Sequence, residues 1–276
     1  MALYCLISAG GSPGVTTTAL GLALTWPGPV LLAECDPSHR SVLPGFLAER
    51  LARPPGPGLL GLAMEAHHGS KIALDALDPY TIPLDGGQGT ARLLHGIRDP
   101  RHAAQLKPLW PALADLFAAT HADVVADLGC VGGSDTPMPL LMRADLIVMV
   151  VRRTVAQVDA AQPRLEALRD GPIRQPFLCV INDGPYTSAA ISRALFDLPV
   201  LGELPDAKGE AQVLSDGARP RRTFRTSLLV RTLNALGRRM RTTAENTVGT
   251  TAGNTAAARV PGGAALVEPK PFGEMA

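Results

Sequence analysis

The stretch Leu3–Thr18, LYCLISAGGSPGVTTT, decides the fold. Its first part, Leu3–Ile7, is a short apolar run without alternation, which is typical of a strand buried on both faces. A glycine-rich segment, Gly10–Gly14, follows, and Val15–Leu24 then has helical character. In a strand, glycine loop and helix unit, backbone N–H groups converge and bind phosphate. The hydroxyl of Thr16, at the start of this helix, is placed to bind a magnesium ion.

The rest of the chain repeats the alternation of short apolar runs and helical segments. The further apolar runs are Val30–Ala33, Val124–Ala126, Leu146–Val151, Phe177–Ile181 and Pro199–Leu201. The further helical segments are Ala103–Ala119, Val155–Arg169, Ser188–Phe196 and Leu228–Met240. Such alternation predicts βαβ units, and therefore a doubly wound α/β fold with a mostly parallel sheet and helices on both faces. The Pro- and Gly-rich residues 51–90 give no clear pattern.

Composition bounds the class of protein. The chain has 276 residues, 46% of them hydrophobic, and a mean hydropathy of +0.14, which excludes a disordered or fibrous chain. No run of 18 apolar residues occurs and no basic segment precedes the glycine loop, so we expect neither a membrane-spanning helix nor a signal peptide. We predict one domain over residues 1–241. Residues 242–276, rich in Thr, Ala, Gly, Asn and Pro, are predicted to form a disordered, flexible tail.

The cysteines and histidines indicate no disulfide framework and no metal centre. Cys5, Cys35, Cys130 and Cys179 show no CxxC pairing, and each lies in or beside an apolar run. This pattern is typical of reduced, buried thiols, so we expect a cytoplasmic protein. The six histidines have no metal-ligand spacing, and no nucleophile elbow is present.

The glycine loop resembles the deviant Walker A loop of the MinD/ParA ATPases, K-G-G-x-G-K-[ST]-T. In register, Gly14, Thr16 and Thr17 match the last glycine and the two hydroxyl residues. Four later segments are similar to family motifs in the same order: Leu31–Pro37 to L-x-D-x-D-P, Ala122–Gly129 to the Walker B strand, Val180–Asn182 to the strand whose Asn faces the base, and Pro199–Asp206 to L-G-x-[IL]-P-x-D. The resemblance covers roughly residues 1–241 and implies a P-loop NTPase fold that binds ATP and Mg²⁺.

The resemblance also implies roles for single residues. Asp36 would orient the attacking water as the catalytic residue, and Thr16, Asp36 and Asp127 would support the metal. The nucleotide-binding residues would be Gly10, Gly11, Ser12, Pro13, Gly14, Val15, Thr16, Thr17, Asn182, Pro205 and Asp206. Independently of the resemblance, Asp36 and Asp127 both follow buried strands, where a carboxylate without a metal or a donor is costly.

Two departures from the family pattern bear on mechanism. The family's two loop lysines fall on Gly10 and Val15, so two cations that face the phosphates are missing. Such cations contribute strongly to phosphoryl transfer, and we therefore expect weak or lost hydrolysis. In this respect the chain resembles the degenerate CpaE/TadZ pilus-localisation group. Arg152 or Arg153, which follow a strand, are candidates to supply the missing charge; the alternative is that both are solvated surface residues.

The resemblance implies an ATP-dependent switch that dimerises and positions another assembly. Its partner would belong to a partitioning, cell-division, secretion or pilus system. A relative, the nitrogenase iron protein, resembles Glu34–Pro37 and Asp127–Cys130, but no cysteine between Cys35 and Cys130 could be the second cluster ligand. We therefore expect Cys130 to be an ordinary thiol.

A basic stretch near the C-terminal end offers a second function. Residues 1–150 carry net charge −4 and residues 151–276 carry +5. The excess lies in an acid-free run of Arg219, Arg221, Arg222, Arg225, Arg231, Arg238, Arg239 and Arg241. The stretch is either the closing helix of the domain with a solvated face, or a surface that binds DNA or an anionic membrane. In the second case the protein would be peripherally attached to the membrane or the nucleoid. The alternatives to the switch are thus a nucleotide-free pseudo-ATPase scaffold and a basic DNA-binding module.

Overall fold

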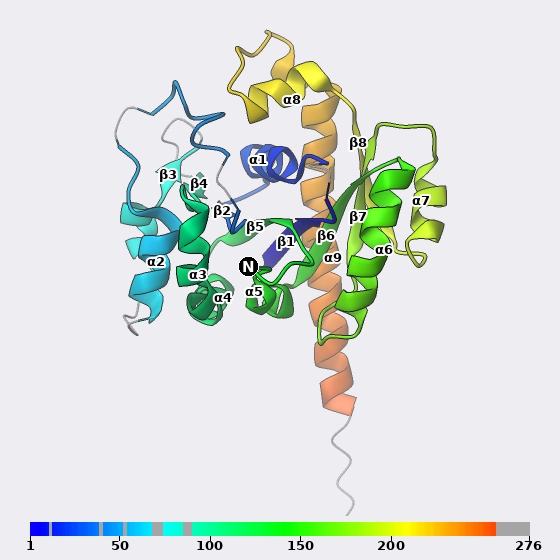
Figure 1. Ribbon diagram of the computed structural model, residues 1–276, viewed down its shortest axis with the longest axis horizontal. Helices are drawn as coiled ribbons and strands as arrows, with labels where there is room; N and C mark the ends of the chain where they lie inside the picture. The colour runs from blue at the N-terminus through cyan, green and yellow to red at the C-terminus, as the bar shows by residue number, and fades with distance from the viewer. Residues whose placement is uncertain (11–12, 39–40, 52–53, 68–73, 85–89, 258–276) are drawn as a thin grey trace, which may run out of the picture.

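The computed structural model describes residues 1–10, 13–38, 41–51, 54–67, 74–84 and 90–257. Within them, the centre of the molecule is an eight-stranded sheet with the order β3-β4-β2-β5-β1-β6-β7-β8 (Figure 1). Only β3 and β4 pair antiparallel. The strands are β1 Leu3–Ser8, β2 Val30–Glu34, β3 Ile82–Pro83, β4 Ala91–Leu94, β5 Asp123–Cys130, β6 Leu146–Arg152, β7 Phe177–Asn182 and β8 Val200–Pro205. The predicted doubly wound fold is confirmed.

Helices cover both faces of this sheet. They are α1 Val15–Thr25, α2 Gly58–His67, α3 Ala103–Leu106, α4 Trp110–Ala119, α5 Met138–Arg143, α6 Val155–Arg169, α7 Ser188–Ala194, α8 Lys208–Ser215 and α9 Leu228–Ala257. The 3-10 turns are η1 Leu74–Tyr80, η2 Pro100–His102, η3 Lys107–Leu109 and η4 Phe224–Thr226. One apolar core lies between the sheet and α2 to α7. The other lies between the sheet and α1, α8, α9 and the turns of residues 41–51.

The parallel strands carry the polar residues of interest to one edge of the sheet. All six residues of β1 and all five of β2 are buried, which explains their unbroken apolar sequences. Each parallel strand ends at the same edge, where ligands of open α/β sheets bind. Gly10, Gly14, Asp36 and Arg152 lie at or just beyond that edge. Asp127 was expected to follow its strand, but it lies within β5, paired with Glu34 at the end of β2, because β5 continues to Cys130.

The predicted elements differ from the observed ones where proline or a positive φ intervenes. The predicted helix Ala103–Ala119 is interrupted by η3, which contains Pro108. The helix predicted over Ser188–Phe196 ends at Ala194, because Phe196 has φ 60° and leaves the helical region. The illegible residues 51–90 contain α2, η1 and β3, short elements whose periodicity is too brief to read.

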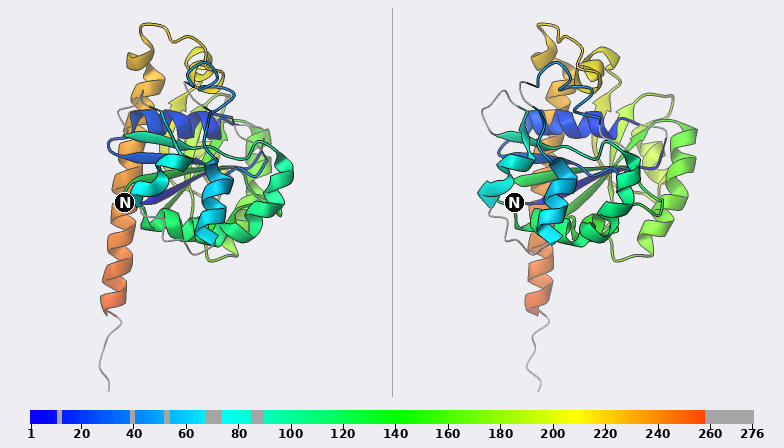
Figure 2. Two further views of the ribbon diagram at one scale, coloured as in Figure 1. Left: turned by 90° about the vertical axis from the view of Figure 1, so that its left-hand side faces the viewer. Right: turned by 60° about the vertical axis from the view of Figure 1, so that its left-hand side comes forward.

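Helix α9 is longer than predicted. It was expected to end at Met240, with a flexible tail from residue 242, but it continues to Ala257, and Ala244 is 1% exposed. The segment 242–257 is therefore helical, and Figure 2 shows the end of α9 extending beyond the sheet. The remaining predicted tail, 258–276, lies outside the described residues. No helix in the described part of the chain, α9 included, is long and apolar enough to span a membrane.

Candidate nucleotide-binding site

The loop between β1 and α1 has the backbone form of a phosphate-binding turn. Gly14 caps α1 with φ 105°, a left-handed conformation that strongly favours glycine, and no side chain caps the helix. The first amides of α1 are therefore not occupied by a capping side chain. Gly10 has φ 143°, and its carbonyl accepts a hydrogen bond of 2.8 Å from Nε2 of the buried Gln157 in α6. Two of the predicted site residues, Gly11 and Ser12, lie outside the described residues.

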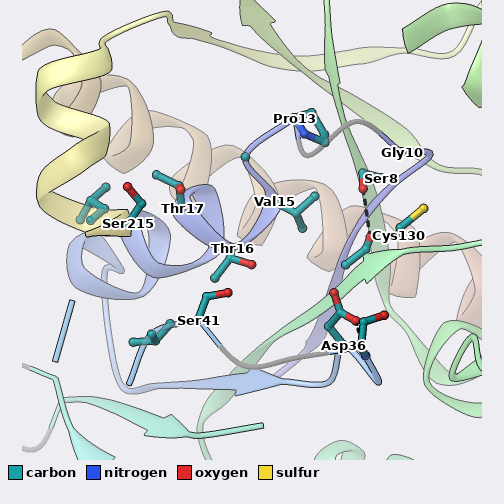
Figure 3. A pocket seen from close by; sticks show the side chains of 15 residues that line it. Ser8, Gly10, Pro13, Val15, Thr16, Thr17, Asp36, Ser41, Cys130 and Ser215 are labelled. Carbon is teal, nitrogen blue, oxygen red and sulfur yellow. Dashed lines mark hydrogen bonds between the residues drawn. The ribbon is translucent and has the colours of Figure 1, made fainter. Parts of the chain in front are cut away.

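A cavity of about 440 Å³ opens at this turn (Figure 3). Hydroxyl groups dominate its polar lining: Ser8, Thr16, Thr17, Ser38, Ser41 and Ser215. Gly10, Pro13, Gly14, Val15 and Asp36 of the predicted site also line it, so the structure brings most of the predicted phosphate-binding residues together. None of the lining residues that the structure describes is Lys, Arg or His. The volume suits a small ligand, but the walls offer hydroxyls and backbone amides instead of cations.

Asp127 and Asp36 lie close together at the base of this cavity. Asp127 is 2% exposed, accepts a hydrogen bond of 3.0 Å from the amide of Gly129, and accepts another from the Thr16 hydroxyl. Asp36 lies against Gly129, where an added Cβ would be 1.9 Å from its Oδ2. Gly129 also has φ 60°, so glycine both forms this turn and leaves room for Asp36.

Burial sets the ionisation of this acidic group. It raises the pKa of Asp127 to about 7; the hydrogen bonds from Thr16 and Gly129 lower it, and the charges of Glu34 and Asp36 raise it. A neutral or half-ionised Asp127 at neutral pH follows from this burial and from the neighbouring carboxylates. The oxygens of Thr16, Asp36 and Asp127 fit Mg²⁺, which prefers few protein ligands and keeps waters or phosphate oxygens for the rest. The predicted metal residues are thus close together.

Glu34, which replaces the family's first Asp after β2, has a role that the sequence did not indicate. Its Oε1 accepts hydrogen bonds from the amides of Ser41 (2.7 Å) and Val42 (2.9 Å), and its Oε2 accepts one from Gly96 (3.2 Å). The side chain is 2% exposed. It therefore ties the pocket wall at residues 41–42, and the chain after β4, to the end of β2.

The positions of the missing lysines hold no cation. Val15 is 6% exposed and packs in the apolar core that α1 shares with α8 and α9, while also lining the cavity. Arg152, a candidate replacement, forms an ion pair with Asp183 and lies 3.8 Å from Asp206. It does not line the 440 Å³ cavity. That Arg152 or Arg153 supplies charge to phosphate stays a prediction.

The other predicted nucleotide-binding residues, Asn182, Pro205 and Asp206, differ in whether they line a cavity. Pro205 and Asp206 line a smaller cavity beside Gly14 and Thr17. Asn182 does not line either cavity among the described residues, although its Oδ1 is buried there without a hydrogen-bond partner. A buried acceptor of this kind is costly unless a ligand or water donates to it.

The four cysteines differ in their exposure. All four cysteines are free; Cys5, Cys35 and Cys179 are buried, and burial raises the pKa of Cys179 to about 12. The expectation that all four are buried is wrong for Cys130, which is exposed because it ends β5 at the cavity.

Helix α9 packs on the domain with one side and exposes arginines on the other, as expected of a closing helix with a solvated face. Leu229, Leu233, Leu236 and Met240 are buried, whereas Arg231 and Arg238 are exposed. Arg241 is not part of the free basic surface, since its Nε lies 3.2 Å from the buried Asp123. Arg239 donates to the Leu201 carbonyl at 3.2 Å. The exposed arginines without a carboxylate partner within the described chain are Arg219, Arg221, Arg222, Arg225, Arg231, Arg238 and Arg239.

A glycine turn between β1 and α1, with β1 near the centre of a mostly parallel sheet, is a fold that the chain shares with solved ATPases of the MinD/ParA type. No protein-family model matches the sequence, and no curated protein matches it. Solved structures do match. A ParA family ATPase from Chlorobium tepidum has TM-score 0.65 at 14% identity, over 86% of this chain and 97% of that one.

Two further structures carry nucleotides. The septum site-determining protein MinD from Pyrococcus horikoshii, complexed with Mg-ADP, has TM-score 0.64 at 14% identity, over 86% of this chain and 94% of that one. A plasmid partition protein from Borrelia burgdorferi, bound to AMPPNP, has TM-score 0.63 at 14% identity, over 91% and 99%. At these identities the likeness establishes the fold, and the chain spans nearly the whole of each neighbour.

Proposed function

We propose that this chain is a MinD/ParA-like switch that binds ATP with Mg²⁺ and positions another assembly. One observation carries the proposal: the 440 Å³ cavity joins the uncapped N-terminus of α1 to Thr16 and Asp36, and the Thr16 hydroxyl also donates to the adjacent Asp127. Helix amides bind anions, and the hydroxyl and carboxylates bind a hard cation, so together they suit a metal-bound phosphate chain. Neighbours of the same fold bind Mg-ADP and AMPPNP, which supports the choice of ligand.

Each group of site residues has a separate role in binding the nucleotide and the metal. The backbone from Gly10 to Thr17 holds the phosphates, Thr16 and Asp127 support the metal, and Asp36 orients water. Mg²⁺, when bound, would neutralise phosphate charge and polarise the terminal phosphoryl group. Pro205 and Asp206, and Asn182 through its unpartnered Oδ1, stand on the side where the base would lie.

Hydrolysis is expected to be weak or lost. The described cavity lining has no cation, and Gly10 and Val15 occupy the positions of the family's lysines. Cations that stabilise the charge of a transferred phosphoryl group each account for several kcal/mol of catalysis in comparable enzymes. Binding needs less, because backbone amides and the metal are also present in the ground state. The loss of these lysines also supports placement in the degenerate CpaE/TadZ-like group.

As a switch, the chain would form a homodimer when nucleotide is bound and recruit a protein partner. Its structural neighbours include a septum site-determining protein and a plasmid partition protein, so the cargo would be a cell-division, partitioning or pilus-type assembly. The exposed arginines would hold the dimer at an anionic surface, membrane or nucleoid, from the cytoplasm.

Calorimetry with ATP, with and without Mg²⁺, tests the proposal. Wild type should bind at micromolar Kd only with Mg²⁺, and light scattering should show a dimer in that state. Thr16→Val removes the metal-facing hydroxyl at nearly constant volume and should weaken binding at least tenfold. Thr232→Val, on the exposed side of α9, is the matched control. No binding by folded wild type at millimolar ATP would refute the switch.

A second candidate function rests on the arginines. Seven exposed arginines over residues 219–239, which have no carboxylate partner among the residues that the structure describes, suit a polyanion whether or not nucleotide binds. The chain would then be a pseudo-ATPase scaffold. A steep decrease of duplex DNA affinity with salt, unchanged by ATP, would favour this function; indifference to DNA and to anionic vesicles would exclude it.

A further inference from the structure

A second, narrower cavity continues from the first around the N-terminus of α1. Pro13, Gly14, Thr17 and Leu214 line both cavities. Strands β7 and β8 and helices α8 and α9 supply mostly apolar walls, and the volume is about 80 Å³. This is far below the roughly 300 Å³ at which small-molecule sites begin, and too small for a purine with its sugar. An apolar slot thus adjoins the phosphate-binding turn, but it is too narrow for a base with its sugar.

Arg152 lies at the mouth of this slot. It is the last residue of β6, and its guanidinium forms an ion pair with Asp183, just after β7, and lies 3.8 Å from Asp206, just after β8. All three side chains are about one-third exposed, at 30%, 38% and 29%. The arginine therefore links the ends of three adjacent strands across the slot.

These contacts fit a gate better than a phosphate ligand. Two carboxylates face one guanidinium, so the group carries a net charge of −1 and attracts no phosphate while it is intact. Ion pairs with this much exposure are weak and are screened by salt, so a ligand can displace the arginine at small cost. The Asp183 backbone is held more firmly, since its carbonyl accepts from the Arg153 amide at 3.0 Å. The movable part is the Arg152 side chain.

We propose that Arg152 controls which ligands enter the site: paired with Asp183 and Asp206, it excludes the base, and its displacement opens the slot to a flat heterocyclic ring. The inference rests on the proposed function, because the ring must belong to a ligand whose phosphates lie in the 440 Å³ cavity. A phosphate chain without a base needs only that larger cavity, so the gate does not affect it. The gate therefore distinguishes nucleotides from inorganic polyphosphates.

Stopped-flow fluorescence with ribose-labelled ADP and Mg²⁺ measures entry of the base, and calorimetry with unlabelled ADP and with inorganic triphosphate gives the affinities. The variant R152A/D183N opens the gate and keeps the local charge at −1, because only Asp206 remains. Arg193→Ala is the matched control, since it removes an exposed arginine of α7 that lines neither cavity and has no carboxylate partner within the described chain. Circular dichroism confirms that each variant is folded.

The double variant should bind labelled ADP at least tenfold faster than wild type, and bind triphosphate within twofold of wild type. Arg193→Ala should match wild type in both. If wild type binds ADP and the double variant binds it no faster, or if triphosphate binding changes as much as ADP binding, the gate is refuted and the nucleotide switch survives. If neither protein binds ADP, with or without Mg²⁺, the proposed function and the gate both fall.

Discussion

Asp127→Asn should remove a pH dependence of stability that burial of this carboxyl creates. The pKa of Asp127 is raised to about 7, whereas the same group in an unfolded chain titrates near 3.9. A raised carboxyl pKa means that the folded state holds its proton longer, so the stabilisation is complete below pH 4 and disappears as the pH rises through 7. Linkage over these two values gives a loss of about 2–3 kcal/mol between pH 5 and pH 8. Asparagine has no such titration.

Urea unfolding of the ligand-free protein at half-unit steps from pH 5 to pH 8 measures this loss. The difference in unfolding free energy between wild type and Asp127→Asn isolates the group, since other titrations cancel. Asp115→Asn, an exposed carboxyl paired with Arg143, is the control and should give a nearly flat difference. If the difference for Asp127→Asn is also flat, the carboxyl is ionised throughout, and the account of a buried acid without a cation is wrong.

Three further changes test the site and the core. Val15→Lys puts a cation beside the cavity, and calorimetry should show an ATP affinity raised about tenfold, equivalent to about 1.4 kcal/mol. Val155→Lys is the control, because Val155 is 63% exposed and does not line the cavity, and it should not change the affinity. Glu34→Gln sets an NH₂ group against backbone amides and should lower the free energy of unfolding in urea by about 1–3 kcal/mol. An unchanged free energy would mean that the three hydrogen bonds do not hold the pocket wall. Gly21→Ala would place Cβ 2.5 Å from Leu233 and should lower stability by about 1–3 kcal/mol in thermal unfolding, while Gly28→Ala, which meets nothing, should be neutral.

The fold could be predicted because its central strands are buried on both faces. Such strands, β1 or β6 for example, have apolar runs that cannot be confused with polar-alternating surface strands. The elements that were missed or misplaced depend on tertiary contacts. Strand β4 is short and exists through pairing with β2, and α9 continues past Met240 through a Thr-rich segment in which Ala244 packs on the core. Composition indicated a tail there because threonine and glycine have low helix propensity, and packing overrides that preference.

The site could be predicted as far as its residues are local to the loop or are strand ends. Gly14, Thr16, Asp36 and Asp127 were found because parallel strands bring their carboxyl ends to one edge. The partners that decide how these groups act are distant in sequence. The Arg152 contact with Asp183 spans 31 residues, and the Glu34 contact with Gly96 spans 62. No spacing rule signals such pairs: Arg152 and Asp206 were candidates for other roles, and Asp183 was not singled out.

The charges around the loop make metal binding and phosphate binding one event. Glu34 accepts hydrogen bonds from three amides, whereas Asp36 lines a cavity whose described lining includes no Lys, Arg or His, and Asp127 accepts from Thr16 of the same lining. A phosphate chain entering alone would add negative charge beside Asp36, and Mg²⁺ entering alone would have to displace the proton that burial holds on Asp127. When the two enter together, Mg²⁺ offsets the negative charge of the phosphate chain and of the aspartates. A loop with lysines can bind metal-free nucleotide; this loop cannot do so without a large loss of affinity. We therefore expect the ATP affinity in EDTA to be at least a hundredfold below that in Mg²⁺, and Val15→Lys to reduce that ratio, because a fixed cation replaces part of what the metal supplies.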